Sequence, residues 1–519
     1  MRRLISLVAA LILGAILITL SILLLTFIPL KIDREVAKET HLGFDENGTY
    51  NMMTRKWIDP DFKMQLQIWV LSIENEEDIV KNGSFPRFAQ KGPYTFIEKQ
   101  HKVKVNFLWN NTRATYRNKR FYWFDANSSC ANCSLDDRVT VPNVIFQKLV
   151  DIALSGGFLV KQAVELVLRA QKRETPFITV TVGEMLFDGY DDPLISAVCN
   201  KDIIRPLCDS AGISSKIGYM YDRNGTDDGE YLIGTGQEDR RTLGKVYKWN
   251  GMDKLPADLW SSEQARMING TDGQLFPPLL SLSEDRYLFI GQLKRSIYMR
   301  YKMGVEFEGV NALRFYVPFE EYDYSRVENK GFCSPSTPIF FDNITQPEGC
   351  LPAGLLDISQ TLPGHARIYI SGSHFFNSPS VVYQNFSGLA EPSSDDETFI
   401  YIEPTAGLVI YAKQMSQINV GMIAGNLRIL SKMRNLIVPV LWLNETIRID
   451  DATRQQLLSS FILLKQKVFV AGVVLLTIGL LLWIAFILIS VIHSYATRRS
   501  DETEQLIVQE DNENEDADN

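Results

Sequence analysis

The stretch Leu4–Leu30, LISLVAALILGAILITLSILLLTFIPL, contains no charged residue. At about 1.5 Å per helical residue it would extend roughly 40 Å, enough to cross the ~30 Å hydrocarbon core of a bilayer with some tilt. The alternative is a cleaved signal peptide, but the run exceeds the usual core of about 7–15 residues and Ile28-Pro29-Leu30 offers no small-residue cleavage site. Val468–Ile492 repeats the uncharged pattern. The sequence therefore predicts two transmembrane helices, 4–30 and 468–492.

Basic residues beside the two stretches indicate the orientation of the chain, because clusters of Lys or Arg tend to stay in the cytosol. Arg2-Arg3 and Arg498-Arg499 lie on the outer flanks and predict that both termini are cytosolic. The signal is weakened by basic residues on the inner flanks: Lys31, Arg34, Lys465 and Lys467.

Glycosylation acceptors give an independent signal for the same topology. The pattern Asn-x-Ser/Thr occurs ten times, and every occurrence lies between the two apolar stretches. The acceptors are Asn47, Asn82, Asn110, Asn127, Asn132, Asn224, Asn269, Asn343, Asn385 and Asn444. This distribution predicts that residues 31–467 form one luminal or extracellular glycosylated domain, and that residues 1–3 and 493–519 are cytosolic.

All six cysteines lie in the same middle segment, in a compartment that favours disulfides. Many connectivities are open, and short separations favour Cys199–Cys208 and Cys333–Cys350. Cys130-Ala-Asn-Cys133 is then either a local structural bridge or a redox or metal site. No second CxxC, nearby His or thioredoxin-like βαβ pattern accompanies it, which favours the structural bridge.

The middle segment is predicted to be mainly β. In Phe62–Val70 apolar and polar residues alternate, which is the period of a strand with one buried face. Similar alternation recurs at Val103–Phe107, Ile178–Val182 and Ile368–Ile370. The pattern predicts strands along the whole segment.

Helical periodicity is concentrated in Asn143–Gln171. Val160, Val164 and Leu168 form one apolar stripe. Further apolar residues widen it: Phe158, Leu159, Leu166 and Val167. Gly156-Gly157 breaks the pattern and predicts two helices. Packing against the rest of the domain is the commoner way to cover such a face, and a binding partner is the alternative.

Motifs for catalysis, metals and cofactors are missing or incomplete. Asp222-Arg-Asn-Gly-Thr-Asp227 resembles the start of a calcium loop, but Asp227 occupies the position of the required Gly and Ile233 that of the required Glu. The chain contains no HExxH, GxSxG or Walker sequence, and its five histidines show no metal-binding spacing. Its net charge of −9 also argues against the basic surface that nucleic-acid binding requires. We predict a protein that is not an enzyme, holds no cofactor or metal, and binds no nucleic acid.

The chain resembles the class B scavenger receptor family in many ordered blocks, nearly from end to end. The blocks are Gly92-Pro-Tyr94, Trp249-Asn-Gly251, Met267–Gly273, Phe276-Pro-Pro278, Arg295–Tyr298, Gly354–Ser359, His374-Phe375 and Val438–Glu445. Tyr221–Asp228 and the C-terminal tail make the resemblance strongest to the lysosomal member of that family.

This resemblance implies a mainly β fold with helices (α+β). Its luminal domain is an antiparallel β-barrel-like body with a helical apex, at about residues 143–173, and an internal hydrophobic tunnel. The tunnel of the family carries cholesterol, phospholipid or fatty acyl chains, and a closed sheet of sufficient girth can enclose such a ligand. Lys172 and Arg173 become candidates for contacting anionic lipids or lipoprotein particles, although exposed cations at a helix end are an equally good interpretation.

Several positions depart from the family pattern. Family cysteines are replaced at three places: Ala265, Lys294 and about Thr361. Only Cys333 and Cys350 match bridge positions of the family. No histidine occurs between Asp151 and Tyr190, where pH-sensitive capture of a glycosidase by the lysosomal member is associated with one. A hydrolase-carrying role is therefore less well supported.

Three functions remain open at this stage. The first is a receptor that passes lipid to the lysosomal membrane. The second is a plasma-membrane scavenger receptor for lipoproteins or microbes, and the third is a sorting receptor for a luminal hydrolase. Assembly into a homo-oligomer is also left open by the sequence.

The cytosolic tail carries an address signal. After Arg499 it contains no Lys or Arg and nine acidic residues, so we expect it to stay unfolded. Glu502-Thr-Glu-Gln-Leu506-Ile507 fits the acidic-x-x-x-Leu-Leu/Ile pattern that clathrin adaptor complexes bind through basic residues and apolar pockets. A chance match is the alternative. The motif predicts residence in the lysosomal membrane, with the plasma membrane as the alternative.

Overall fold

The structure is a computed structural model that describes residues 2–171, 175–199 and 216–517. The chain forms two compact units. Thr40–Asp451 make the first, called here the β unit. The two terminal segments, up to Glu39 and from Ala452, make the second, called the helical unit.

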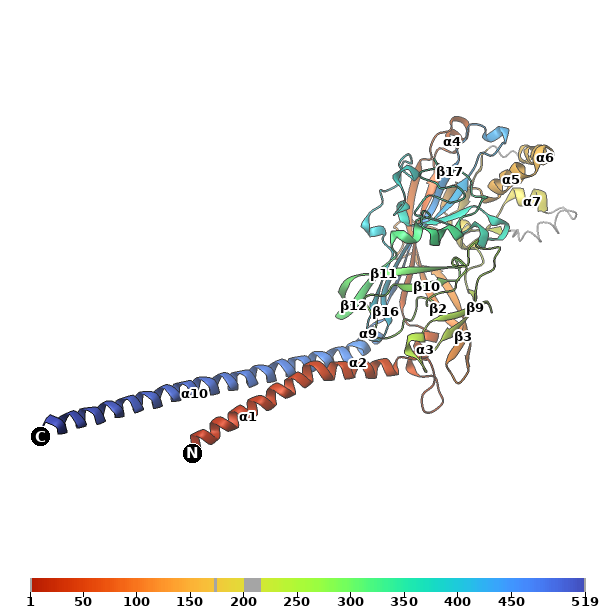
Figure 1. Ribbon diagram of the computed structural model, residues 1–519. Coiled ribbons are helices and arrows are strands. Elements are labelled where there is room, and N and C mark those ends of the chain that lie inside the picture. Colours follow the sequence, from red (N-terminus) through yellow and green to blue (C-terminus); the bar gives the residue numbers. More distant parts are fainter. Residues whose placement is uncertain (1, 172–174, 200–215, 518–519) are drawn as a thin grey trace. The chain divides into compact units, whose positions relative to one another are not determined.

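Most strands of the β unit belong to one antiparallel sheet that is nearly closed (Figure 1). Its order is β10-β11-β12-β15-β16-β17-β1-β2-β3-β8-β9, and β14 joins at β16 and pairs with β13. Thr271 links the two ends of this order, because it bridges Lys245 beside β9 and Leu288 in β10. The strands of this sheet are β1 Lys63–Ile73, β2 Phe88–Leu108, β3 Arg113–Phe124, β8 Thr226–Gly234, β9 Val246–Trp249, β10 Arg286–Ile290, β11 Arg295–Phe307, β12 Val310–Tyr316, β13 Leu355–Asp357, β14 Ile368–Ser371, β15 Phe399–Glu403, β16 Leu408–Met422 and β17 Leu436–Arg448. Two small pairs lie outside it: β4 Arg138–Pro142 with β5 Phe177–Thr181, and β6 Tyr190–Asp191 with β7 Lys216–Ile217.

Strand β1 shows why the sequence folds in this way. Its alternate residues from Met64 to Val70 are buried, while the residues between them are partly exposed, as the two-residue period predicts. Leu66 pairs with Glu445 of β17 on one side and with Phe96 of β2 on the other. The mainly β prediction is therefore confirmed, with β1 in the middle of the sheet.

The helices of the β unit gather mainly at one end of the sheet, where α4 to α7 lie, while α3 lies at the other end (Figure 1). They are α3 Met52–Ile58, α4 Glu76–Asn82, α5 Val144–Ser155, α6 Gly157–Ala170 and α7 Pro193–Cys199. The predicted break between two helices is confirmed: Gly157 has a φ of 75°, a conformation that favours glycine. Asn143 caps α5, because its Oδ1 accepts a hydrogen bond from the Phe146 amide at 2.9 Å.

The helical unit contains two helical stretches long and apolar enough to cross a membrane, Leu7–Glu39 and Leu463–Gln505. The first begins within α1 Arg2–Ile22 and continues through a π-helical turn at Leu23–Phe27 to the end of α2 Ile28–Glu39. The second follows α9 Asp451–Leu457 and a π-helical turn at Leu458–Ile462, and is α10 Leu463–Ala517. Both helical stretches continue past the C-terminal ends of the predicted apolar runs 4–30 and 468–492.

The two long helices approach each other closely at glycines. A Cβ on Gly14 would lie 2.5 Å from the Trp483 ring and 3.1 Å from the Gly479 carbonyl oxygen. Ser21 Oγ donates to the Gly472 carbonyl at 2.8 Å. Small residues of this kind let helices pack backbone to backbone where no water is present to drive association.

The tail departs from the prediction of an unfolded segment. Helix α10 continues without interruption from the apolar run to Ala517. No Gly or Pro follows Gly479, and extending an existing helix by one residue avoids the cost of starting a new one. The prediction rested on the composition of the tail and did not consider that the tail continues an apolar helix.

Candidate functional site

A series of polar side chains lies buried on the inner face of β2 and β3. Glu98, Gln100 and Lys102 share that face because alternate residues of a strand point to one side, and each is only 2 or 3% exposed. Arg120 and Asn118 of β3 pair with Gln100 and Lys102. We call the connected set the polar chain: Glu98, Gln100, Lys102, Asn118, Arg120, Gln274 and Glu445.

The acidic end of the polar chain is two carboxylates held by one arginine. Arg120 Nη1 lies 3.3 Å from Glu445 Oε1 and 3.5 Å from Glu98 Oε1. The side chains of Arg120 and Glu445 are 26% and 13% exposed, whereas that of Glu98 is fully buried. Glu98 Oε2 has no hydrogen-bond donor among the described residues. Burial, and then repulsion from Glu445, raise the pKa of Glu98 to about 7.

The other end runs through amides to a buried lysine. Gln100 Oε1 accepts hydrogen bonds from Asn118 Nδ2 at 2.9 Å and from Gln274 Nε2 at 3.2 Å. Lys102 Nζ donates to Gln274 Oε1 and lies 5.0 Å from the ring centre of Trp57. Burial lowers the pKa of Lys102 to about 8. Since Gln100 also donates to Glu98 at 2.9 Å, the polar contacts are continuous from Glu445 to Lys102.

The polar chain lies between two apolar clusters of the β unit. Along the inner face of β3, Ala114 and Tyr116 belong to one cluster and Tyr122 to the other. Asn118 and Arg120 occupy the positions between them. This part of the inner face is therefore charged in its middle and apolar at both ends.

A second unusual surface lies on helices α5 and α6. Phe158, Leu159 and Leu166 are 73%, 80% and 69% exposed. The expectation that packing covers this whole face is wrong for these three residues, and correct for Val164 and Leu168, which are buried. Ile152 and Leu154 of α5 are also exposed, and we call these five exposed apolar residues of the two helices the α5–α6 patch.

Polar contacts fasten these two helices to the rest of the β unit. Asp151 of α5 forms an ion pair with Arg367 at 2.9 Å. The Arg428 amide donates to Glu165 Oε1 of α6 at 3.1 Å. Because the helices are fixed in this way, the patch is a surface of defined shape.

The predicted glycosylation acceptors differ in accessibility. Eight are exposed: Asn47, Asn82, Asn110, Asn127, Asn132, Asn224, Asn343 and Asn385. Asn269 is half-buried, and so is Asn444, which lies within β17 where its Nδ2 is 3.4 Å from Gln67 Oε1. Occupancy at all ten stays a prediction. Asn444 differs from the exposed acceptors because it lies in β17, a strand paired on both sides.

Disulfides join Cys333 to Cys350 and Cys130 to Cys133. The second bond agrees with the interpretation of CxxC as a local bridge. Cys199 ends α7, and its predicted partner Cys208 lies outside the described residues.

The structure does not test the remaining predicted site residues. Lys172 and Arg173 lie outside the described residues. Glu502, Leu506 and Ile507 all lie on α10. Their proposed roles stay predictions.

The polar chain was missed by sequence reasoning. Residues 98–102 read Glu-Lys-Gln-His-Lys, so polar residues occupy both faces of β2 and no buried face stands out. A register shift between Val103 and Asn106 further obscures the pattern. Only the pairing of β2 with β3 shows that Glu98 and Arg120 share the interior.

Comparisons with known proteins identify the family. The model of the CD36 family matches residues 12–490. Lysosome membrane protein 2 of Rattus norvegicus is 32% identical over 453 residues, covering 85% of this chain and 87% of that protein, and the Homo sapiens protein of that name is 30% identical with the same coverage. Scavenger receptor class B member 1 of Sus scrofa is 26% identical over 473 residues, covering 90% and 86%. The resemblance drawn from motifs is confirmed, and the chain belongs to the CD36 family.

Proposed function

We propose that this membrane protein binds lipid (cholesterol, phospholipid or fatty acid) and passes it through the β unit to the lysosomal membrane. The observation that carries the proposal is the α5–α6 patch, where Phe158 and Leu159 are 73% and 80% exposed. Exposed apolar patches on a fixed surface are typical of sites that bind apolar ligands, membranes or proteins. No catalytic residue is part of the proposal.

Burial of the lipid supplies the driving force. Each CH₂ group removed from water contributes about 0.8 kcal/mol, so an acyl chain or sterol gains several kcal/mol from contact with apolar side chains. The two apolar clusters of the β unit extend such an environment inward from the helices. The polar chain between them offers hydrogen-bonding groups to the polar end of an amphipathic lipid.

Uptake by the delipidated luminal segment, residues 31–467, tests the proposal. Wild-type protein should take up a photoactivatable sterol or fatty acid, and Phe158→Gln/Leu159→Gln should take it up more slowly. The matched control is Val327→Gln/Leu282→Gln, because these residues are also apolar and exposed, at 78% and 54%, but lie elsewhere. Equal uptake by both double variants would exclude the patch as the entry site.

The topology and address form a second part of the proposal. We place both termini in the cytosol, with the β unit in the lumen and residues 502–507 available to clathrin adaptors. The similarity to proteins named for the lysosome membrane supports this address. Leu506→Ala/Ile507→Ala should move the protein to the cell surface. Unchanged lysosomal staining of this double variant would show that the motif is not required for sorting.

A plasma-membrane scavenger receptor is the second candidate, because the chain also matches proteins named scavenger receptor class B member 1. That function requires wild-type protein at the cell surface and uptake of lipoprotein particles or microbes by cells that express it. Surface biotinylation of unaltered protein separates the two candidates, since the lysosomal proposal predicts a small surface fraction.

A further inference from the structure

The loop from Asp125 to Asp137, between β3 and β4, contains two glycosylation acceptors and a disulfide within a few residues. Asn127 and Asn132 are both exposed. The disulfide joins Cys130 to Cys133, so the acceptor tripeptide Asn132-Cys133-Ser134 has a bridged cysteine as its middle residue. The two possible modifications therefore share one short segment.

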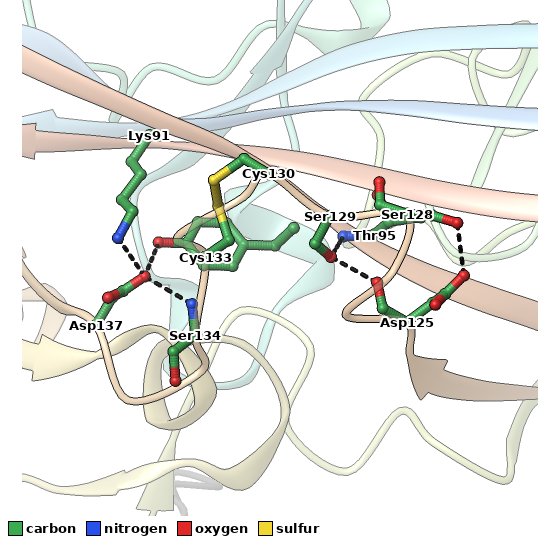
Figure 2. Close-up of a disulfide and its surroundings, with 10 residues drawn as sticks. Lys91, Thr95, Asp125, Ser128, Ser129, Cys130, Cys133, Ser134 and Asp137 are labelled. Atoms are coloured by element: carbon green, nitrogen blue, oxygen red, sulfur yellow. Dashed lines mark hydrogen bonds and ion pairs between the residues drawn. A yellow bond between two sulfur atoms is a disulfide. The ribbon is translucent and has the colours of Figure 1, made fainter.

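The segment before the bridge is fastened to β2. The Cys130 amide donates to the Pro93 carbonyl at 2.9 Å. The Thr95 amide donates to Ser129 Oγ at 2.9 Å (Figure 2). These contacts fix the position from which the bridge departs.

The segment after the bridge is fastened through Asp137. The Ser134 amide donates to Asp137 Oδ2 at 2.9 Å, and Lys91 Nζ lies 2.6 Å from the same oxygen (Figure 2). The hydroxyl of Ser134 accepts a hydrogen bond from the Asp136 amide at 3.2 Å. The hydroxyl that completes the acceptor motif is therefore already engaged.

The bridge itself closes the tripeptide into a turn. The Cys133 amide donates to the Cys130 carbonyl at 2.9 Å. A glycosyltransferase must bind the asparagine amide and the hydroxyl two residues later at the same time, which requires a chain that can change its conformation. A closed ring that includes the middle residue opposes that change.

We propose that Asn132 is a conditional modification site: it is glycosylated only while Cys130 and Cys133 are open thiols, and closure of the bridge first leaves it unmodified. The two reactions then compete in the newly made chain. A glycan that is added first remains on Asn132. Because the Asn132 side chain is exposed, the glycan does not prevent the bridge from forming afterwards.

The chemistry of each route is complete. In bridge formation the two thiols lose two protons and two electrons to a protein disulfide of the secretory pathway, which is reduced to a dithiol. In glycan transfer a bond forms between Asn132 Nδ2 and the anomeric carbon of the donor sugar, the bond from that carbon to phosphate breaks, and the amide loses one proton.

Local closure favours the bridge. The two cysteines are separated by three positions, so their thiols can meet before the domain folds, and the rate of bridge formation is set by the oxidant. Asn127 has no such competitor. The Ser129 hydroxyl of its tripeptide is also engaged, since it donates to the Asp125 carbonyl at 2.7 Å and accepts from the Thr95 amide of β2 at 2.9 Å. The tripeptide Asn127-Ser128-Ser129 contains no cysteine, however, so no covalent bond closes it. Asn127 is therefore an internal control five positions away.

Mass spectrometry of full-length protein can measure both modifications on one peptide. Trypsin releases Phe121–Arg138, which contains both acceptors and both cysteines. Alkylation before digestion marks open thiols, and enzymatic glycan removal in heavy water marks occupied asparagines. In wild type we expect the ratio of Asn132 to Asn127 occupancy to be well below one.

Cys130→Ser removes the bridge without changing the tripeptide and should raise that ratio toward one, with Asn127 unchanged. A pulse of dithiothreitol during synthesis of the wild-type chain should do the same, and it keeps the test valid if the variant is retained in the endoplasmic reticulum. Equal occupancy of the two sites in untreated wild type would overturn the proposal. So would a ratio that changes neither in Cys130→Ser nor after dithiothreitol.

Discussion

The α5–α6 patch and the polar chain both depart from the usual rule that apolar side chains are buried and charged side chains are exposed. Phe158 and Leu159 are apolar and exposed, whereas Glu98 and Lys102 are chargeable and buried. Each arrangement is unfavourable on its own: one leaves apolar surface in water, and the other removes charges from it. Conflicts of this kind concentrate at functional sites. In the proposed function the patch serves binding, and the raised pKa of Glu98 makes the interior sensitive to protonation.

The largest expected difference between the two regions is in stability. Arg120→Leu should destabilise the β unit by about 3 kcal/mol at pH 7.5, because it leaves Glu98 and Glu445 buried together without their shared cation. Thermal unfolding measures the loss. The loss should shrink at pH 5, where Glu98 is protonated, and a loss that is the same at both pH values would argue against the acid pair.

The next effect is a pH dependence carried by Glu98. Its pKa is about 7 in the folded protein and 4.5 in the unfolded reference, so between these values the folded state binds a proton that the unfolded state does not. Stability therefore falls as pH rises from about 4.5 to 7, by up to about 3 kcal/mol. Glu98→Gln should remove this slope and be more stable than wild type at pH 7.5.

The matched control for that prediction is Glu306→Gln. Glu306 is an exposed carboxylate of β11, so its removal should leave the slope between pH 4.5 and 7 in place. Lys102 does not confuse the measurement, because its pKa of about 8 lies above the window. Identical pH profiles for both variants and wild type would show that the buried acid is not the cause.

A smaller effect is expected from the support beneath the patch. Asn143 caps α5 and also donates to Asp192 Oδ2 at 2.7 Å, and it is 1% exposed. Asn143→Ala should cost about 1–2 kcal/mol, since it removes the cap and leaves Asp192 without this donor. Urea unfolding measures the change. No loss would mean that α5 is held by its packing alone.

The smallest expected change in stability is in the patch itself. Phe158→Gln/Leu159→Gln should alter the unfolding free energy by less than about 0.5 kcal/mol, because side chains that are mostly exposed lose little contact when replaced. The same variant should slow lipid uptake. A loss of several kcal/mol would instead show that the patch is covered in the folded protein.

Much of the fold was predictable because it depends on local periodicity. The alternation in Phe62–Val70 predicted β1, and Gly156-Gly157 predicted the break between α5 and α6. The helical tail was not predicted, because its state follows from the apolar helix that precedes it rather than from its own composition.

The candidate site was predictable only in part. The apolar residues of α6 were identified, but not which of them the fold leaves exposed, since exposure of Phe158 depends on what packs nearby. The polar chain depends on Glu98, Arg120 and Glu445 meeting from three strands. Contacts between different strands, such as that of Arg120 with Glu445 at a separation of 325 positions, leave no periodic signal in a single sequence.

The central claim is that the β unit holds lipid, and the most direct test is mass spectrometry of what co-purifies with it. Residues 31–467, secreted from cells and purified without detergent, should carry sterol, phospholipid or fatty acid in a reproducible ratio to protein. The Val327→Gln/Leu282→Gln control should carry the same amount, and Phe158→Gln/Leu159→Gln less. Wild-type protein that is free of lipid, and that stays so after incubation with vesicles containing cholesterol and phospholipid, would contradict the account.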